Sequence, residues 1–264
     1  MALHTFHLAK PGFLRTMGAL LRPPTSRTVS GLLHAECMMP MELGSSIFSR
    51  GRWQMGRLAM FAAWEDEAAI DAFLAGPPLG RALAAGWHVR LSFLRRWGNI
   101  AALDGLPEKA AETDLDAPVV AVTVARMKMF QVPRFLHWGK PVERQVRDHP
   151  GTTLALAAIR PPRTISTFTV WHSAREMIGM VHGRGGGESP ERHVKAMGER
   201  RRKDFHVEFT TLRYTCSSEH GEWEGRSAIV PKGDGQPRRE PRSPIASSAK
   251  SSGIAGGRGG TIEP

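Results

Sequence analysis

Cysteine and long apolar runs are both scarce in this sequence. Cys37 and Cys216 are its only two cysteines among 264 residues, and they do not form a CxxC pair. A disulfide framework or a zinc site is therefore not expected, and a reducing, cytosolic setting is the simplest expectation. Lys10 and Arg15 interrupt the first apolar residues, so we expect no signal peptide. No apolar run approaches the ~18–20 residues that span a bilayer, so any membrane association should be peripheral.

Motifs that bind nucleotides or activate a serine are also missing. No GxGxxG marks a strand–helix junction, so we expect no Rossmann-type cofactor. The glycine run Gly185–Gly187 lacks the Lys-Ser/Thr pair of a phosphate-binding loop, so we predict a flexible turn there. No GxSxG nucleophile elbow occurs either.

The formal net charge is +11, but the basic residues are scattered along the chain. One dense run, Arg200–Lys203, lies between Glu199 and Asp204, which is typical of a solvated helix end that suits the helix dipole. The alternative is a binding patch for an anionic partner. Because no aromatic-rich signature such as an RNP motif accompanies the basic residues, we expect no nucleic-acid partner.

The C-terminal segment differs in composition from the rest of the chain. From about Val230 to Pro264 it is rich in Gly, Ser, Pro and Arg, and it has almost no large apolar residues. Such a segment cannot bury enough apolar surface to offset the entropy lost on ordering. We therefore predict a folded body over residues 1–226 and a disordered tail over residues 227–264.

The most informative feature is an internal repeat. The segment Phe61–Asp66 (FAAWED) is matched by Phe168–Ser173 (FTVWHS). In both, a strand-like stretch ends at a tryptophan, and two residues later comes Asp66 or Ser173, whose side chains favour a helix N-cap. Apolar residues at +4, +7 and +8 from each cap predict one buried helical face.

A second pair of segments repeats further along the chain. Trp87–Phe93 and Phe205–Thr211 both alternate apolar and polar residues with the period of a half-buried strand. His88 and His206 occupy matching positions on the more polar side, so we expect both to face solvent or an interface. Two unrelated α+β pieces with generic patterning are the alternative to a true repeat.

Each half of the chain shows the pattern β-α-β-β-α-β, the split βαβ arrangement. The first half should open with a strand, a helix and a strand over Leu3–Ala9, Phe13–Leu21 and Thr28–Cys37. The second half should open in the same way over Val119–Ala125, Val132–Trp138 and Thr152–Ile159. We therefore predict an α+β fold of two tandem ferredoxin-like units, residues 1–103 and 118–226, joined by a linker over residues 104–117.

Sheets of this kind carry helices on one face and leave the other face to be covered. Two such units can close into an α+β barrel that encloses a cavity, or a ligand can fill the space between sheet and helices. Both geometries predict an apolar ligand site, although the fold by itself does not identify the ligand.

Five segments and one further aromatic residue of the second half form a distinctive series: Ala121–Arg126, Arg134–Trp138, Phe168–Met177, His193–Met197, Phe205 and Arg213–Tyr214. In this series the second half resembles spheroidene monooxygenase and its relatives. Tyr214 stands where the family has phenylalanine. The first half is similar in a looser way, so the resemblance extends over most of residues 1–226.

Proteins of that family contain heme and introduce oxygen at an unactivated position of an acyclic carotenoid. The resemblance therefore implies a heme-dependent monooxygenase that acts on a hydrophobic substrate such as a carotenoid and takes electrons from a donor. Side chains cannot activate oxygen for such a carbon, so a redox cofactor must supply that step.

His193 is the candidate ligand of the heme iron. It begins a short helix beside apolar Val194 and Met197, and it matches the family's histidine. The alternative is a histidine at the edge of the core, bonded to backbone or solvent. Arg126 and Arg213 lie on predicted strands and are candidates for the heme propionates. An ion pair within the protein, or an exposed position, is the alternative for each.

Two other functions stay open. A cofactor-free monooxygenase of the same barrel architecture would need a substrate that forms a stabilised carbanion, such as a polyketide quinol. A non-catalytic heme or small-molecule binder would hold its ligand without turning it over. Assembly into a homo-oligomer is compatible with all three functions.

Overall fold

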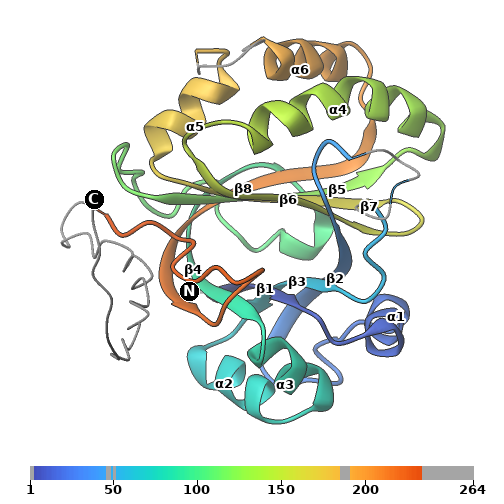
Figure 1. The fold of residues 1–264 in the computed structure, drawn as a ribbon, viewed down its shortest axis with the longest axis vertical. Helices are drawn as coiled ribbons and strands as arrows, with labels where there is room; N and C mark the ends of the chain where they lie inside the picture. Colours follow the sequence, from blue (N-terminus) through green and yellow to red (C-terminus); the bar gives the residue numbers. More distant parts are fainter. Residues whose placement is uncertain (1–2, 46–48, 50–51, 185–190, 234–264) are drawn as a thin grey trace, which may run out of the picture.

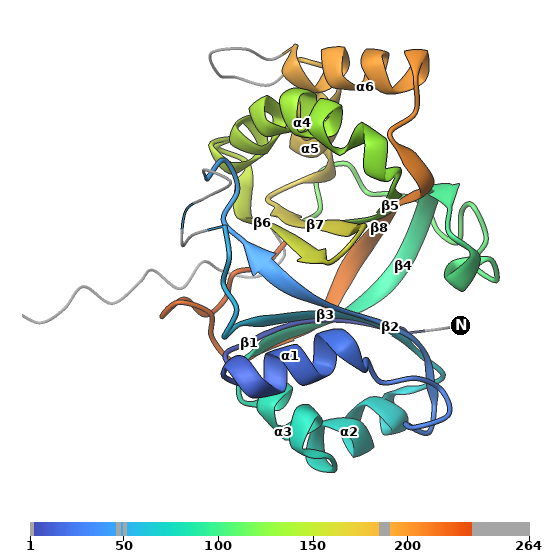
Figure 2. The same ribbon diagram turned by 90° about the vertical axis from the view of Figure 1, so that its right-hand side faces the viewer.

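Eight strands form a closed barrel in the part of the chain that the structure describes (Figure 1, Figure 2). The computed structural model describes residues 3–45, 49, 52–184 and 191–233. Around the barrel the strands follow the order β1-β3-β2-β6-β7-β5-β8-β4, and every neighbouring pair is antiparallel. The strands are β1 (Leu3–Ala9), β2 (Leu32–Met41), β3 (Leu58–Trp64), β4 (Trp87–Asn99), β5 (Val119–Met127), β6 (Thr152–Arg160), β7 (Thr164–Trp171) and β8 (His206–His220).

Helices cover the barrel on two opposite sides, as Figure 1 shows. The first helix layer consists of α1 (Phe13–Leu21), α2 (Glu67–Ala75) and α3 (Pro78–Ala84). The second helix layer consists of α4 (Val132–Arg147), α5 (Ala174–Val181) and α6 (Arg192–Arg202). Two short 3₁₀ turns are η1 (Ala101–Leu103) and η2 (Met129–Gln131). None of the described helices has the length and hydropathy that crossing a bilayer requires.

The two halves of the chain repeat one arrangement and close into a single barrel. Strands β1–β4 carry the first helix layer, and strands β5–β8 carry the second. The halves meet at two seams, where β4 pairs with β8 and β2 pairs with β6. The predicted α+β fold of tandem ferredoxin-like units that form a barrel is therefore confirmed.

The repeated segments occupy equivalent places in the two halves. Trp64 ends β3 and Trp171 ends β7, and both rings are almost completely buried. The Asp66 side chain accepts a hydrogen bond from the N–H of Ala69 at 2.8 Å, and Ser173 accepts one from Glu176 at 3.2 Å. Both predicted N-caps are confirmed, so each tryptophan marks the point where a strand gives way to a capped helix.

The second strand begins later than the sequence suggests. We expected it over residues 28–37, whereas β2 spans Leu32–Met41. The Thr28 hydroxyl donates to the carbonyl of Thr25 at 3.1 Å and accepts from the N–H of Thr25 at 2.9 Å. These side-chain bonds hold a turn where β-branched residues alone would favour a strand.

The segment after β8 belongs in part to the folded body. Ile229 is only 2% exposed and joins the cluster of side chains that fills the barrel. A boundary between body and tail at residue 227 is therefore too early, because this short apolar pair, Ile229 and Val230, finds a site on the barrel core. The remaining tail residues, 234–264, and the predicted turn at Gly185–Gly187 lie outside the described residues.

Aromatic side chains pack the barrel interior. Phe6 from the first half stacks on Phe168 from the second, with ring centres 3.8 Å apart. Trp87 meets Phe168 edge to face at 5.9 Å, and Tyr214 lies fully buried beside Phe61. The interior thus joins the two halves through a shared core, and a ligand is better placed between the sheet and its helices.

Candidate functional site

The two helix layers differ in how tightly they pack on the barrel. Under the first layer, large side chains of β3 such as Leu58, Met60 and Trp64 are fully buried. The outward face of β5–β8 carries several small side chains beside the large Trp171, and five of the small ones stay partly exposed: Ala121, Thr123, Ala155, Thr167 and Thr211. No residue of α4 or α6 is buried. Helices α4 and α6 are therefore loosely packed, whereas α5 packs on Trp171 through Ala174, Met177 and Met180.

His193 lies where α4, α5 and α6 meet. Its backbone N–H donates to the side-chain oxygen of Gln145 at 3.1 Å, and its ring Nδ1 is 3.1 Å from the carbonyl oxygen of Val181. Because a carbonyl oxygen can only accept, Nδ1 carries the proton and Nε2 presents a lone pair. Burial lowers the pKa of His193, an effect that the Val181 carbonyl partly opposes, so the ring is neutral at pH 7.

Arg126 lies inside the barrel, on the opposite side of the sheet from His193. It binds the fully buried carboxylate of Glu36, which also accepts from Arg160 at 2.7 Å and lies 3.0 Å from His34 Nε2. Burial alone would raise the pKa of Glu36, but the hydrogen bond from His34 and the two guanidinium charges lower it overall. The carboxylate that Arg126 binds thus belongs to the chain itself, which was the alternative to a heme propionate.

Arg213 lies on the outward face of β8 at the seam with β4. It is 8% exposed, and its guanidinium carbon is 4.7 Å from the centre of the Trp97 ring. Burial and then the charge of Arg95 lower the pKa of Arg213 to about 10. Among the described residues it has no carboxylate partner, so its charge remains available to an anion.

The structure does not bring the three predicted residues into one site. His193 lies in the second helix layer, Arg126 lies inside the barrel, and Arg213 lies at the seam between the two halves. A strand position alone does not tell which face of the sheet a side chain occupies once the sheet is covered on both faces.

The two histidines expected to face solvent or an interface are buried. His88 and His206 are each 6% exposed. The prediction of a solvent-facing position was wrong because both faces of a barrel strand are covered here, one by the interior and the other by helices. His206 donates through Nδ1 to the carboxylate of Asp204 at 3.0 Å and packs edge to face on Phe135 of α4. Its Nε2 therefore carries a lone pair, and burial lowers its pKa.

His149 is a candidate that the sequence did not reveal. It follows α4, is 7% exposed, and lies with its ring centre 5.2 Å from that of Trp171. Its Nδ1 accepts from the N–H of Gly151 at 3.0 Å, so the proton sits on Nε2, which has no partner among the described residues. A buried donor without a partner marks a place where a ligand or water can bind. The His-Pro-Gly turn is its only local signal, and it fits an ordinary loop equally well.

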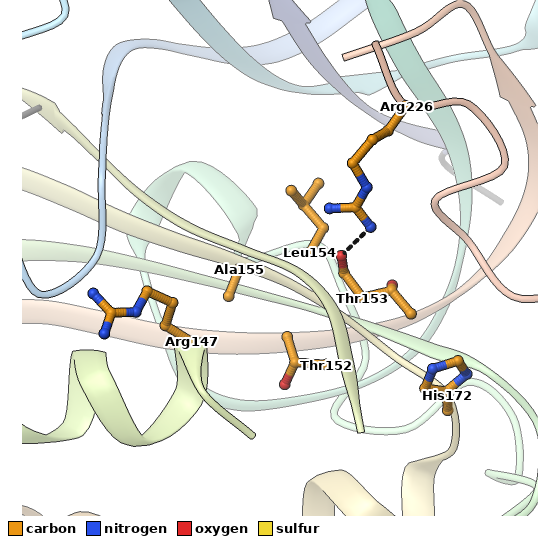
Figure 3. Close-up of a pocket in the computed structure, with 7 residues that line it drawn as sticks. All are labelled: Arg147, Thr152, Thr153, Leu154, Ala155, His172 and Arg226. Atoms are coloured by element: carbon orange, nitrogen blue, oxygen red, sulfur yellow. Dashed lines mark hydrogen bonds between the residues drawn. The ribbon is translucent and has the colours of Figure 1, made fainter. Parts of the chain in front are cut away.

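A pocket of about 460 Å³ lies at the C-terminal end of α4 (Figure 3). It is lined by Arg147, Thr152, Thr153, Leu154, Ala155, His172 and Arg226. Arg226 donates to the carbonyl of Thr153 at 2.8 Å, as the dashed line in Figure 3 shows. Two arginines line the pocket, Arg147 and Arg226. The charge of Arg147 is neutralised by its bidentate contact with Asp148, at 2.6 and 2.9 Å. The lining suits the polar end of a ligand better than a hydrocarbon.

Several features thus meet at the C-terminal end of α4. Gln145 contacts His193, Arg147 lines the pocket, and His149 follows the last turn of the helix. We take this end of α4, together with the outward face of β5–β8, as the candidate site.

The residues present fit a heme in one respect. A heme iron needs a single protein ligand, and His193 offers a neutral ring whose Nδ1–H is held by a backbone carbonyl, the arrangement typical of metal-binding histidines. Within the described residues no group of three or more His, Cys, Asp or Glu side chains could hold a metal ion by themselves. His193 fits as the ligand, whereas Arg126 does not fit as a propionate partner because Glu36 occupies it.

Comparison with known proteins gave one curated relative. The chain is similar to spheroidene monooxygenase of Rhodobacter capsulatus, with 25% identity over 197 residues that cover 72% of this chain and 78% of the relative. No family model matches the chain.

Among solved structures, the chain aligns with a protein from Fusobacterium nucleatum that is named as a monooxygenase. That alignment covers 84% of this chain and 94% of the other, with 9% identity and a TM-score of 0.36. An alignment with an anthrone oxidase-like protein covers 86% and 96%, with 14% identity and a TM-score of 0.31.

The barrel and the curated relative together give the class that can be stated: the chain is an α+β barrel that is similar in sequence to a monooxygenase. The resemblance to spheroidene monooxygenase that the sequence predicts is confirmed by the match to the Rhodobacter capsulatus enzyme.

Proposed function

We propose that the chain is a monooxygenase that oxidises a hydrophobic substrate bound between the second helix layer and the outward face of β5–β8. We propose further that heme is its cofactor and that His193 is the ligand of the iron. The observation that carries this proposal is the hydrogen bond between His193 Nδ1 and the carbonyl oxygen of Val181, at 3.1 Å, which leaves a lone pair on Nε2. The relative's name indicates spheroidene, so a carotenoid is the substrate class that we favour.

The residues of the chain would contribute binding and orientation. Heme, when bound, supplies the activation of molecular oxygen that side chains cannot provide. The partly exposed small side chains on β5–β8 form the surface on which we place the apolar body of the substrate. His149 can donate its unpartnered Nε2–H to a polar group of the ligand, and the adjoining pocket can hold a polar end. Arg213 is the one predicted arginine still available to a propionate.

An absorption spectrum tests the heme proposal. We expect the purified chain supplied with hemin to show a Soret band, and we expect His193→Ala to weaken hemin binding at least about tenfold, because loss of groups around a metal costs about that much or more. His182→Ala is the matched control, since His182 is exposed, lies near the same layer and also bonds through Nδ1 to a carbonyl, that of Ile178 at 2.8 Å. Equal hemin binding by wild type and His193→Ala would refute the assignment.

The pair Asp204–His206 favours a second candidate, a cofactor-free monooxygenase. The Asp204 carboxylate orients the His206 ring, whose Nε2 lone pair lies beside aromatic side chains and can accept a proton from a carbon acid. This function predicts oxygen uptake with a quinol or anthrone substrate in heme-free protein, abolished in His206→Gln. Hemin binding without turnover in the presence of reductant and oxygen would point instead to a non-catalytic carrier.

A further inference from the structure

The outer face of α1 is apolar and uncovered. Phe13 is 53% exposed, Leu14 is 83% exposed and Leu21 is 76% exposed, although large apolar side chains usually find cover. The inner face of the same helix already packs on the barrel through Ala19 and Leu20. A helix that is apolar on both faces normally has a partner on each.

Two more exposed apolar side chains lie on the loop between β2 and β3. Trp53 is 43% exposed and Met55 is 50% exposed. The N–H of Gly12, just before α1, donates to the carbonyl of Gly56 at 3.2 Å, which places the Gly56 end of the loop beside the start of the helix. We define the α1 surface by its five exposed apolar residues: Phe13, Leu14, Leu21, Trp53 and Met55.

Basic residues without acidic neighbours in the sequence flank the α1 surface. The first 35 residues contain Lys10, Arg15, Arg22 and Arg27, and no Asp or Glu. The three arginines are exposed and form no ion pair within the described residues. Apolar side chains flanked by unpaired arginines are the signature of a segment that lies in the interface of an anionic bilayer.

The same loop connects the α1 surface to the candidate site. Arg52, next to Trp53, forms two hydrogen bonds with Glu143 of α4, at 2.8 and 3.0 Å. The N–H of Gly44 also donates to Glu143, and Arg147 donates to the carbonyl of Leu43 at 2.9 Å. A membrane bound at the α1 surface would therefore lie next to the loop that is fastened to α4.

We propose that the α1 surface docks the protein on an anionic lipid bilayer, with the apolar side chains inserted at the level of the headgroups and Arg15, Arg22 and Arg27 bound to lipid phosphates. The inference goes beyond the proposed oxygenation chemistry and does not depend on heme.

Charge favours a bilayer over a second copy of the chain as the occupant. A twofold dimer through the α1 surface would bring the same surface of each copy together. The arginines of one copy would then face those of the other, with no acidic residue of this segment between them. An anionic bilayer supplies the missing negative charge.

Vesicle co-sedimentation of the full chain tests the proposal. We expect binding to vesicles of phosphatidylcholine with phosphatidylglycerol, and much weaker binding to phosphatidylcholine alone. Each substitution Arg15→Gln, Arg22→Gln or Arg27→Gln should lower the partition coefficient about fivefold. The double variant Leu14→Glu, Leu21→Glu should lose more than tenfold.

Leu115→Glu is the matched control, because Leu115 is an exposed leucine, at 42%, that lies between Asp114 and Asp116. Its binding should equal that of the wild type. Circular dichroism checks that each variant is folded, which is expected since all the substituted residues are exposed. Failure of the wild type to bind anionic vesicles would overturn the proposal. So would a dimer, seen by light scattering, that the double leucine variant dissociates while vesicle binding stays absent.

Discussion

At the scale of single residues, three histidines stack across neighbouring strands. His7, His88 and His220 lie on β1, β4 and β8 in direct register, with ring centres 5.2 and 4.9 Å apart. His7 is fully buried, and neither of its ring nitrogens has a partner among the described residues. Burial, and then the neighbouring charges, lower the pKa of His7 well below its usual value and that of His88 to about 4. Arg90 opposes protonation of both rings, and it is bound in turn by Glu67 and Asp71.

This stack predicts a loss of stability in mild acid. In the unfolded chain a histidine takes up a proton near pH 6.5, whereas His88 in the folded chain does so only near pH 4. The unfolded state therefore binds more protons between these values, and the free energy of unfolding falls as the pH is lowered through that window. His88 alone can contribute up to about 3 kcal/mol of this loss, and His7 acts in the same direction. Urea denaturation at pH 7.5 and pH 4.5 measures the change.

Two variants separate the stack from other titrating groups. His88→Phe keeps an aromatic ring between His7 and His220 but removes the proton site, so its stability should fall less between the two pH values. His172→Gln removes an exposed histidine and should leave the pH dependence unchanged. The stack would not be the cause if His88→Phe lost as much stability in acid as the wild type.

At the scale of helices and strands, local signals in the sequence were sufficient for most elements. The tryptophan at the end of β3 and β7, followed by a capping side chain, marked both strand–helix junctions because every part of that signal lies within six residues. The first strand and the first helix have the predicted bounds, Leu3–Ala9 and Phe13–Leu21. The start of β2 could not be predicted because side-chain hydrogen bonds between Thr25 and Thr28 outweighed strand propensity.

The candidate site depends on contacts that are distant in sequence, so less of it could be predicted. His193 was found because its segment resembles a known family, but its proton position is set by Val181 on another helix. The proton of His149 is fixed only two residues away, by Gly151, yet its burial depends on Trp171. Arg126 matched the family's strand, while its partner Glu36 comes from the other half of the chain. Residue type and spacing thus indicated candidates, and pairing across the barrel decided their roles.

At the scale of the whole molecule, the two seams between the halves are unequal. β4 and β8 pair over eleven positions, whereas β2 and β6 pair over only three. Glu36 of β2 binds Arg126 and Arg160 of the second half, so an ionic contact accompanies the shorter seam. Removing one partner of a buried ion pair is strongly destabilising. Closure of the barrel therefore depends on Glu36, Arg126 and Arg160.

The C-terminal segment, residues 221–233, holds the two halves together at one end of the barrel. Glu224 binds Lys10 at 3.0 Å and Arg57 at 2.6 Å, both in the first half, while Arg226 donates to the carbonyl of Thr153 in the second. The segment then buries Ile229 in the barrel core. This segment therefore connects the two halves and belongs to the folded body, rather than being the start of a disordered tail.

Truncation on either side of Ile229 tests this role. A chain ending after residue 226 loses the burial of one large aliphatic side chain and two backbone donors, the N–H groups of Ile229 and Val230, which bind Glu219 at 2.7 and 3.1 Å. Glu219 also accepts from the indole N–H of the buried Trp87 at 2.7 Å. Removing the two backbone donors therefore affects a carboxylate that is bonded to a core side chain. We expect this chain to be about 2–4 kcal/mol less stable than the full chain in urea denaturation.

A chain ending after residue 233 should match the full chain, and Ile229→Ala in the full chain should reproduce most of the loss. Equal stability of the chains ending at 226 and 233 would show that residues 227–233 contribute nothing to closing the barrel.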